Sequence, residues 1–502
     1  MSNTSIARWI ALSVFATLVG RAQSEVRPAN RSVSGDYSLR NLSLGEPRFS
    51  NPDLYNLYDQ GGSPMGLLET HRERMSLSAG LLSSDRSSPG DSLRISHGDY
   101  NIPQFGFFQP GVFGAVLYFN RESESYYRKG ADSVDVGKTR FGLDLAAGPS
   151  SGIFRIGFGV HGALGSMEYP GDPSRVLLEL PSLRLDIGSR PISGLEIGIF
   201  TGMSAHFDSL ETPLDRHERV AYMTLPRYGI LADIGGDKQF PFMGNAALEL
   251  GTDRFLGEFR QVGQAGVEYP ILWTGYWDFR TQWLYSLSVN DFTLEPSFLF
   301  AKRSENAQGY AGIKANQNPF RKGAKLPALA WTAGTTSFGL GGHVRYREGA
   351  SLLLEWETTG RSFDLDSNIE KRYDRFTAGA ECNLDRWEAL PLPKVMTLAL
   401  RIGWTWSEEP KDQPGYRALQ FDPFIRAPQV PTRLSMEDPV PSSPAAYTAF
   451  HLGFGLGLLE NRLTLDGLLS FPEQLEEFTL TPARTKAVGG TEFGLTAAYR
   501  VF

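Results

Sequence analysis

The chain has 502 residues, of which 12% are aromatic and 21% are charged, and it contains 54 glycines. This composition is unlike that of a helical enzyme and is compatible with a long domain built from strands. The formal net charge of -7 indicates no basic stripe that would grip phosphates, so we expect no nucleic-acid partner.

The N-terminus has the features of a secretory signal. Arg8 precedes the apolar stretch Trp9–Val19, and Gly20 and Ala22 are small residues at the spacing that a signal peptidase reads. The stretch is about half as long as the ~20 apolar residues that a membrane-spanning helix needs. We therefore predict a signal peptide over residues 1–22, which directs export of the mature chain.

Residues 23–74 form a region of their own with little periodicity. The region contains three turn signals, at Asn51-Pro52, Gly61-Gly62 and Ser63-Pro64. It is too long to be a mere leader. Two interpretations stay open: a flexible periplasmic segment, or a hatch that enters the domain that follows.

Two motifs in this region, Arg40–Gly45 and Ser63–Leu67, resemble the opening of the long-chain fatty acid transporter family and of related secretion-associated barrels. In that family a Leu-Gly run precedes an Asn-Pro-Ala-Gly-Leu-like motif that enters the barrel as a hatch. Here Ser63 replaces the Asn and Met65 replaces the Ala. The resemblance implies either a path for a hydrophobic small molecule or, in the secretion branch, a docking surface. The implied hatch residues are Ser63, Pro64, Gly66 and Leu67.

Residues 75–502 show repeated alternation of apolar with polar or small residues. Between Met396 and Trp406, Met, Leu, Ile and Trp alternate with Thr, Ala, Arg and Gly. Because successive side chains of a strand point to opposite faces, this pattern predicts a strand with one apolar and one polar or glycine-rich face. The same pattern occurs in Phe154–His161, Trp273–Arg280, Leu352–Glu357, Arg375–Cys382 and Phe450–Leu458.

An exported chain built from such strands must be held together by its sheet. The single cysteine, Cys382, cannot form an intramolecular disulfide. No later segment is long and apolar enough for a membrane helix, and in lipid only a closed barrel pairs every strand edge. We predict an all-β fold, a transmembrane antiparallel β-barrel of about 14–18 strands, even in number. A soluble sandwich also alternates, but rarely with so much glycine opposite Phe, Leu and Trp.

Connection lengths and the C-terminus offer two further tests of this prediction. Outer-membrane barrels alternate short periplasmic turns with long outer loops. We expect long links at 303–329, 361–372 and 407–446, with shorter turns between them. The lipid face of the last strand contains Phe493, Leu495, Ala497, Tyr499 and Val501. The terminal Phe502 resembles the aromatic ending that the barrel assembly machinery recognises, which makes that machinery an expected partner.

The polar positions of the predicted strands give the candidates for lumen-lining residues. They carry charges of both signs, and charges inside a barrel must be either paired or in contact with water. Wet charges would set the ion preference of a channel, whereas paired charges would hold the walls around a plug. The candidates are Asp144, Arg155, His161, Asp278, Arg280, Glu355, Glu357, Arg375, Glu381, Arg401, His451 and Arg500.

Motifs for other chemistry are sparse. The seven His residues are scattered, without the spacing of a zinc site, so we expect no metal and no cofactor. The glycines of Gly453–Gly457 alternate as a strand, and no helix follows to hold a phosphate. His161 with Ser166 is the nearest candidate for a hydrolase pair, although a histidine on the lumen wall explains it more simply.

The sequence therefore predicts a protein of the cell outer membrane. After the signal peptide it consists of a hatch or periplasmic segment over 23–74 and a barrel over 75–502. We expect passive uptake of a small solute, hydrophobic if the family resemblance holds, with outer-membrane lipid around the wall and no enzymatic activity. A non-conducting barrel that scaffolds secretion, adhesion or surface assembly is one alternative, and a barrel hydrolase is another.

Overall fold

The computed structural model describes most of the predicted barrel and two parts of the N-terminal region. The described residues are 35–50, 63–69, 75–87, 93–109, 112–128, 134–149, 154–169, 172–192, 195–212, 216–234, 242–261, 267–268, 271–310, 325–347, 349–364, 368–387, 393, 396–408, 447–459, 461–478 and 484–500. The predicted signal peptide and the terminal Phe502 lie outside them.

The alternating segments of the sequence form twenty strands in this part of the chain. They are β1 (Met75–Ser87), β2 (Leu93–Gln109), β3 (Phe113–Arg128), β4 (Val134–Ala147), β5 (Arg155–Tyr169), β6 (Asp172–Ile192), β7 (Leu195–Thr212), β8 (Arg216–Ile234), β9 (Phe242–Gln261), β10 (Val267–Glu268), β11 (Ile271–Tyr285), β12 (Leu287–Val289), β13 (Phe292–Tyr310), β14 (Lys325–Tyr346), β15 (Ala350–Asp364), β16 (Asn368–Asn383), β17 (Thr397–Ser407), β18 (Tyr447–Leu458), β19 (Leu463–Phe478) and β20 (Arg484–Arg500).

Three short helices occur among the described residues. They are α2 (Gly35–Ser43) and the 3-10 helices η2 (Pro64–Glu69) and η3 (Leu384–Arg386). None of the helices in the described residues is long and apolar enough to cross a membrane.

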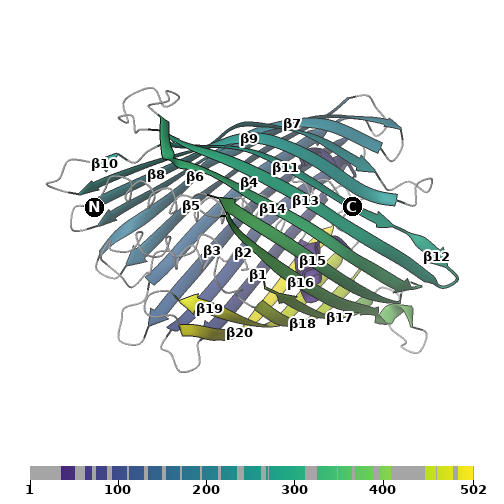
Figure 1. The fold of residues 1–502 in the computed structure, drawn as a ribbon. Helices are drawn as coiled ribbons and strands as arrows, with labels where there is room; N and C mark the ends of the chain where they lie inside the picture. Colours follow the sequence, from purple (N-terminus) through teal and green to yellow (C-terminus); the bar gives the residue numbers. More distant parts are fainter. Residues whose placement is uncertain are drawn as a thin grey trace.

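The strands pair in an antiparallel sheet that closes on itself. β1 pairs with β2 along one edge and with β20 along the other, where Leu77 lies opposite Tyr499. β10 and β12 have only two and three residues, and each adds to one long strand. The remaining eighteen of the twenty strands make up the ring in Figure 1. The predicted antiparallel barrel is confirmed, at the upper end of the expected strand number.

The wall separates an apolar outer face from a polar inner face. In β17, Leu400, Ile402 and Trp404 are 43% to 48% exposed, whereas Arg401 and Thr405 are 9% and 2% exposed. Alternation of this kind follows from the pleat of a strand. An apolar outer face on a closed barrel matches the hydrocarbon core of a bilayer, where every backbone N–H and C=O must be paired within the sheet.

The two ends of the barrel differ. At one end the chain turns sharply between strands, as at Asn290-Asp291 between β12 and β13. Met75 begins β1 and Arg500 ends β20 at this same end, because Ser76 pairs with Arg500. We call it the short-turn end, and it lies on the right in Figure 1.

The predicted alternation of long and short links is wrong in part. β15 continues to Asp364 and β16 begins at Asn368, so the link there is 365–367 instead of 361–372. β13 likewise continues to Tyr310, beyond the predicted start of the link at 303. The apolar alternation that identifies a strand stops where the strand leaves lipid, whereas backbone pairing continues into polar sequence. The link expected at 407–446 falls almost wholly outside the described residues.

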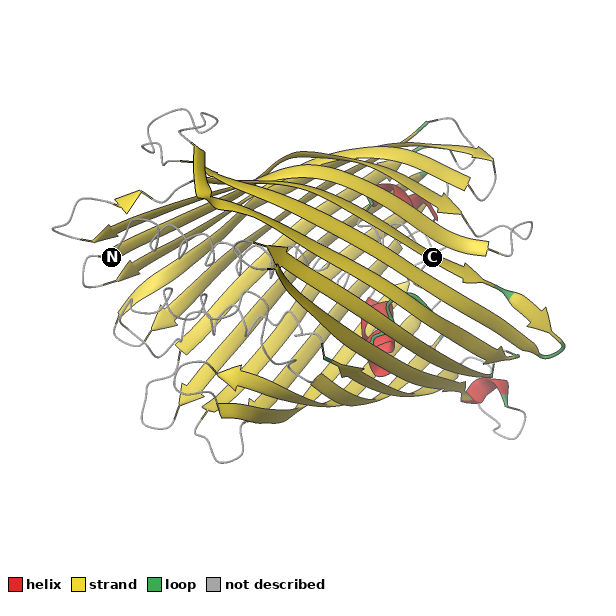
Figure 2. Cartoon of the chain, viewed as in Figure 1, coloured by secondary structure: helices red, strands yellow, loops and turns green. Residues whose placement is uncertain are grey.

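Two of the helices, α2 and η2, lie inside the ring in the half nearer the short-turn end (Figure 2). Leu39 and Leu42 of α2 pack on Leu468 of β19. η2 packs on the next arc of the wall, from β2 to β6. The described parts of the N-terminal region therefore contact the inner wall at two separate places, and these two contacts make up the candidate site.

The lumen and the N-terminal segment as candidate functional site

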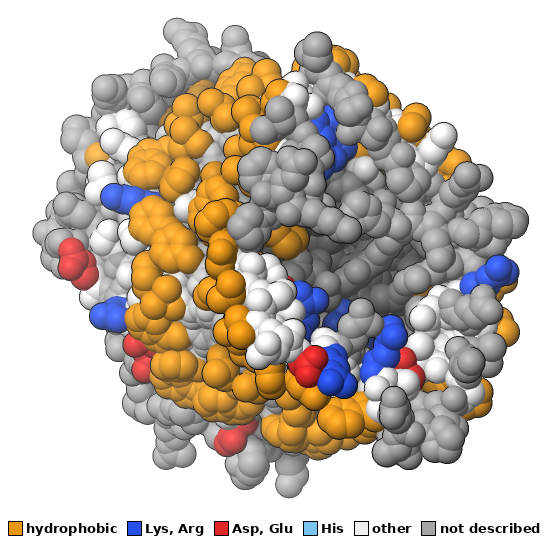
Figure 3. All heavy atoms as spheres, turned by 90° about the vertical axis from the view of Figure 1, so that its right-hand side faces the viewer, with side chains coloured by type: hydrophobic (Ala, Val, Ile, Leu, Met, Phe, Trp, Pro, Cys, Tyr) orange, Lys and Arg blue, Asp and Glu red, His pale blue; other side chains and the backbone are white. Residues whose placement is uncertain are grey.

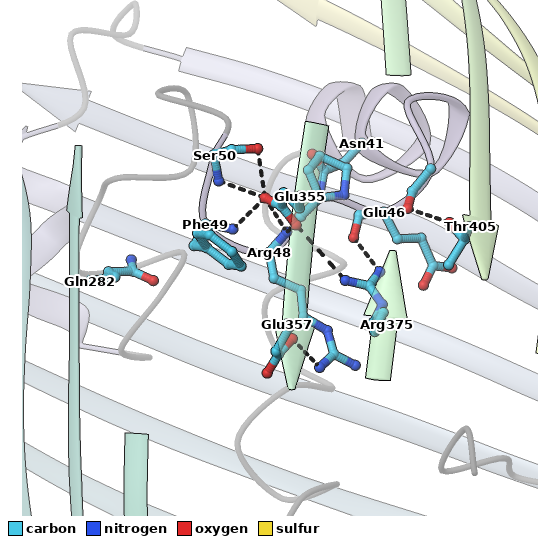
Figure 4. Close-up of polar contacts among 12 residues, drawn as sticks. Asn41, Glu46, Arg48, Phe49, Ser50, Gln282, Glu355, Glu357, Arg375 and Thr405 are labelled. Atoms are coloured by element: carbon cyan, nitrogen blue, oxygen red, sulfur yellow. Dashed lines mark hydrogen bonds and ion pairs between the residues drawn. The ribbon is translucent and has the colours of Figure 1, made fainter. Parts of the chain in front are cut away.

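The first of these places involves Arg40–Ser50 and the strands β15 to β19, and we call it the ionic anchor. Its centre is the carboxylate of Glu355 on β15 (Figure 4). This carboxylate accepts hydrogen bonds from the backbone N–H groups of Arg48, Phe49 and Ser50 at 2.6–3.0 Å, and from the Ser50 hydroxyl at 2.7 Å. Glu355 is only 4% exposed. Several charge-assisted bonds to one buried carboxylate offset the cost of removing it from water.

Two further side chains complete this contact. The Arg48 guanidinium donates to Glu357 at 2.8 Å, two positions along β15 and on the same face as Glu355. Arg375 on β16 donates to the backbone carbonyl of Glu46 at 2.6 Å and lies 3.8 Å from Glu355. The segment thus provides a cation for Glu357, and the wall provides one for the Glu46 carbonyl. The buried charges of β15 and β16 therefore all have partners in this contact.

A second chain of ion pairs runs across β16, β17 and β19. Arg40 of α2 binds the Glu381 carboxylate with two hydrogen bonds, at 2.7 and 2.8 Å. Glu381 also accepts from Arg401 at 2.7 Å, and Arg401 in turn contacts Asp466 on β19. Arg401 and Glu381 would pair even without α2, since both belong to the wall. Arg40 therefore adds one charge to a network that the barrel already contains.

Glycines of the inner wall allow the backbone of Ser43–Gly45 to lie directly against the strands. An ideal Cβ on Gly403 of β17 would lie 2.6 Å from the Leu44 carbonyl carbon and from the Ser43 carbonyl oxygen. Gly45 itself has a φ of +87°, a conformation that side chains disfavour. Thr405 donates its hydroxyl to the Gly45 carbonyl beside this contact. The glycine-rich face of the wall is thus the surface that receives the segment.

The second place involves Ser63–Leu68 and the strands β3 to β8, and we call it the apolar anchor. Met65 is fully buried and packs with Phe200 and Leu231. Ideal Cβ atoms on Gly188 and Gly198 would each lie 2.9 Å from the Met65 methyl carbon. On neighbouring strands, Leu67 and Leu68 pack with Val116 and Ala146. This contact depends on shape more than on charge.

One polar contact borders the apolar anchor. Ser63, fully buried, donates its hydroxyl to Asp186 of β6, and Arg184 donates to the same carboxylate at 2.8 Å. The four hatch candidates Ser63, Pro64, Gly66 and Leu67 are all buried inside the ring.

His161 lies between two side chains that occupy both of its ring nitrogens. Tyr118 contacts Nδ1 at 2.6 Å, and Asp144 contacts Nε2 at 2.9 Å. Tyr118 and Asp144 are 4% and 2% exposed. No serine hydroxyl among the described contacts reaches this ring, and the side chain of Ser166 lies outside the described ones. Among the described side chains, this arrangement fixes the imidazole in the wall, with both ring nitrogens occupied by groups other than a serine hydroxyl.

The other lumen candidates lie at separate points of the inner face. Arg155 pairs with Glu196, and both are fully buried. Asp278 lies 3.6 Å from Arg303, with Arg280 two positions along the same strand. His451 of β18 is 1% exposed. The side chain of Arg500 lies outside the described ones.

Several partners in these contacts were missed by the sequence prediction. Asp186, Glu196 and Asp466 all occupy inward positions and pair with predicted or neighbouring arginines. The sequence contains a signal for two of them. Asp466 directly follows the segment Leu463–Leu465, and Asp186 lies within Leu183–Ile187, and both segments alternate with the period of the strands that were identified. No cluster of three metal-ligating side chains occurs among the residues that the structure describes.

Figure 3 shows the molecule from the short-turn end. Hydrophobic side chains cover much of the left and lower parts of the rim, and the centre is hollowed. Lys, Arg, Asp and Glu side chains gather at the lower edge of this hollow. On this part of the rim, charged side chains thus lie inside a band of apolar ones, as expected for a wall between lipid and a lumen.

No protein-family model matches the chain, and no curated protein matches it in sequence. Solved barrels are similar in structure. The chain resembles the unliganded ferric citrate transporter FecA, with 9% identity, a TM-score of 0.43 and coverage of 85% of this chain and 78% of that chain. It resembles the monoaromatic hydrocarbon channel CymD, with 9% identity, a TM-score of 0.34 and coverage of 92% and 96%.

A third similar structure is the outer membrane protein OprD from Pseudomonas aeruginosa, with 9% identity, a TM-score of 0.33 and coverage of 85% and 93%. At these scores the fold of the present chain rests on its own strand pairing. Its apolar outer wall is the surface that an outer-membrane protein presents to lipid, in agreement with the predicted location.

Proposed function

We propose that the chain is an outer-membrane barrel for passive uptake of a small solute, with the N-terminal segment as a hatch in its lumen. The observation that supports this most directly is the position of Arg40–Ser50 and Ser63–Leu68 inside the ring, each against its own arc of the wall. A lumen obstructed by a separate segment can open when that segment moves. One filled by wall side chains could open only by rearranging the sheet.

The chemistry of the ionic anchor suits a contact that can be released. Burying ion pairs costs desolvation free energy that largely cancels their attraction, so a buried pair holds its partners with a modest net free energy. Water or a solute that enters the lumen can replace the hydrogen bonds that Arg48–Ser50 donate to Glu355. The barrel itself loses no strand pairing in this step.

The nature of the solute is a finer part of the proposal. The resemblance of Arg40–Gly45 and Ser63–Leu67 to the fatty acid transporter family favours a hydrophobic solute, which would need apolar surface in the lumen. Met65, Phe200 and Leu231 form a buried apolar cluster, and Phe200 and Leu231 would face the lumen only after η2 moves. Reconstituted vesicles loaded in parallel with a long-chain fatty acid and with a neutral sugar would separate the two kinds of solute, since only one should pass at a rate above empty vesicles.

A reversible crosslink tests the hatch. Leu42 of α2 and Leu468 of β19 pack together, so the double variant Leu42→Cys with Leu468→Cys, in a Cys382→Ser background, should form a disulfide. We expect the oxidised barrel to pass no solute in a planar bilayer or swelling assay, and the reduced barrel to pass it again. Each single-cysteine variant is the matched control.

Two outcomes of this experiment would contradict the proposal. Equal passage in the oxidised and reduced states would remove the hatch but leave a transport barrel. No passage in any state, with folding confirmed by heat-modifiable gel mobility, would instead favour a barrel that scaffolds secretion or adhesion.

A further inference from the structure

Three buried polar side chains on adjoining strands of the inner wall have unpaired donors. Asn245 of β9, Gln282 of β11 and Ser297 of β13 are 8%, 0% and 6% exposed. In the described part of the chain, Nδ2 of Asn245, Nε2 of Gln282 and Oγ of Ser297 have no hydrogen-bond partner. Buried polar groups are nearly always paired, and each unpaired donor lowers stability. Three of them together therefore indicate a place where acceptors bind.

The strand register puts these groups within reach of one small molecule. Gln282 lies directly opposite Asn245 in the pairing of β11 with β9. Ser297 lies opposite Leu284, two positions from Gln282 along the same face. Directly opposite residues have Cβ atoms about 5 Å apart, and diagonal neighbours are about 7–8 Å apart. We call Asn245, Gln282 and Ser297 the amide patch.

The ionic anchor borders the amide patch through Phe49. An ideal Cβ on Gly341 of β14 would lie 2.8 Å from Ser297 Oγ and 3.1 Å from Phe49 Cε2, so this ring lies beside Ser297. In Figure 4, Gln282 extends from its strand towards the side on which Phe49 lies. Movement of the ionic anchor would thus take an aromatic ring away from the edge of the amide patch.

The charges around the amide patch favour a neutral ligand. Asp233 of β8 lies opposite Asn245, and Arg280 lies two positions from Gln282 on β11. Arg280 donates to the Gln282 side-chain oxygen at 3.4 Å, which leaves the amide nitrogen as the free end. Opposite charges on the two sides give no preference for an ion of either sign. Unpaired N–H and O–H groups require oxygen acceptors.

We propose that the amide patch binds a neutral solute rich in hydroxyl or carbonyl oxygens, such as a small sugar, when the ionic anchor moves aside. This inference rests on the proposed uptake through the barrel, but it names a polar solute in place of the hydrophobic one that the family resemblance favours. The amide donors of Asn245 and Gln282 and the Ser297 hydroxyl would bind solute oxygens once the Phe49 ring has moved away from the edge of the patch.

Equilibrium binding to the full-length, detergent-solubilised barrel tests this inference without relying on transport. With maltose as the probe, titration calorimetry should show saturable binding. Gln282→Met and Asn245→Leu should each weaken that binding at least tenfold. Glu370→Gln is the control, because Glu370 is an exposed residue of β16 and belongs neither to the amide patch nor to the contacts of the ionic anchor described above. Its affinity for maltose should equal that of the wild type.

The thermal unfolding midpoint separates binding from a structural role. Replacing an unpaired buried polar group by an apolar one of similar shape leaves stability equal or higher. Ser297→Ala removes a hydroxyl that has no partner among the described residues, so this variant should weaken maltose binding without lowering the midpoint. A lowered midpoint with unchanged maltose affinity would overturn the inference, as would absence of saturable binding in the wild type. Passage of solute without such binding would overturn the inference and leave the proposed uptake intact.

Discussion

The ionic and apolar anchors hold one segment by different physical means. At the ionic anchor, Glu355 gathers four donors from Arg48–Ser50, and each contact joins groups that water could satisfy. At the apolar anchor, Met65 fills a space bordered by Gly188 and Gly198, and water offers no substitute for that contact. We therefore expect loss of a charge or addition of salt to weaken the ionic anchor, and a change of side-chain volume to weaken the apolar anchor.

This difference suggests that the two anchors of the N-terminal segment have different roles when the segment moves. A contact that depends on exchangeable hydrogen bonds can open at modest cost, whereas a packed contact opens only with loss of buried apolar surface. We therefore expect the ionic anchor to release first and the apolar anchor to tether the segment. Four experiments test whether the two anchors differ in this way.

The largest effect on the ionic anchor should come from Gly403→Leu. A leucine side chain there would occupy the space of the Ser43 and Leu44 backbone, so the ionic anchor cannot form. Overpacking of this kind costs about 1–3 kcal/mol, so we expect trypsin cleavage after Arg40 or Arg48 to become up to about a hundredfold faster. Gly342→Ala is the control, because its nearest atom would be 3.9 Å away. Unchanged cleavage in the leucine variant would refute the close seating.

Met65→Ala should have the largest effect on the apolar anchor. Removing a buried methionine side chain costs about 2–5 kcal/mol, through lost burial and the cavity that remains. We expect faster hydrogen exchange at Met65–Leu68, while protection at Arg48–Ser50 persists. The effect should be the same at low and high salt. Equal loss of protection at both anchors would show that they form one cooperative unit.

Glu355→Gln should loosen the ionic anchor by a smaller amount. The amide keeps one acceptor oxygen but loses the charge, and hydrogen bonds to a charged group are worth about 1.5–3 kcal/mol. Exchange at the amides of Arg48, Phe49 and Ser50 should rise, with Met65 unaffected. Glu370→Gln, an exposed position on β16, is the matched control. A rise at Met65 alone would contradict the assignment of Glu355.

Salt should have the smallest effect, and only on the ionic anchor. Arg40 is 30% exposed in its pair with Glu381, so ions can reach it. Partly exposed pairs contribute about 1 kcal/mol or less, and 1 M salt screens charges beyond about 3 Å. We expect up to about fivefold faster exchange around Arg40 and no change at Leu67. If both anchors responded equally, charge would not distinguish them.

The sequence was sufficient to predict which face of the wall each side chain occupies. It was not sufficient to predict where the strands end or which charged side chains pair. Leu400, Ile402 and Trp404 could be assigned outward and Arg401 inward, because the pleat of a strand fixes the face of each side chain. The ends of β13 and β15 could not, because polar sequence carries no lipid signal. Partners such as Arg401 and Asp466 come from strands that are far apart in sequence, so their pairing depends on the register of the ring.

The sequence alone was thus enough to predict a closed antiparallel barrel with an apolar outer face, because period-two alternation in an exported chain is compatible with few other folds. The contacts of the inner face could be identified only in the folded structure. The glycines opposite Phe, Leu and Trp receive the backbone at Ser43–Gly45 and the side chain of Met65. Such contacts join the N-terminus to strands hundreds of residues away, and local periodicity says nothing about surfaces that meet only when the ring closes.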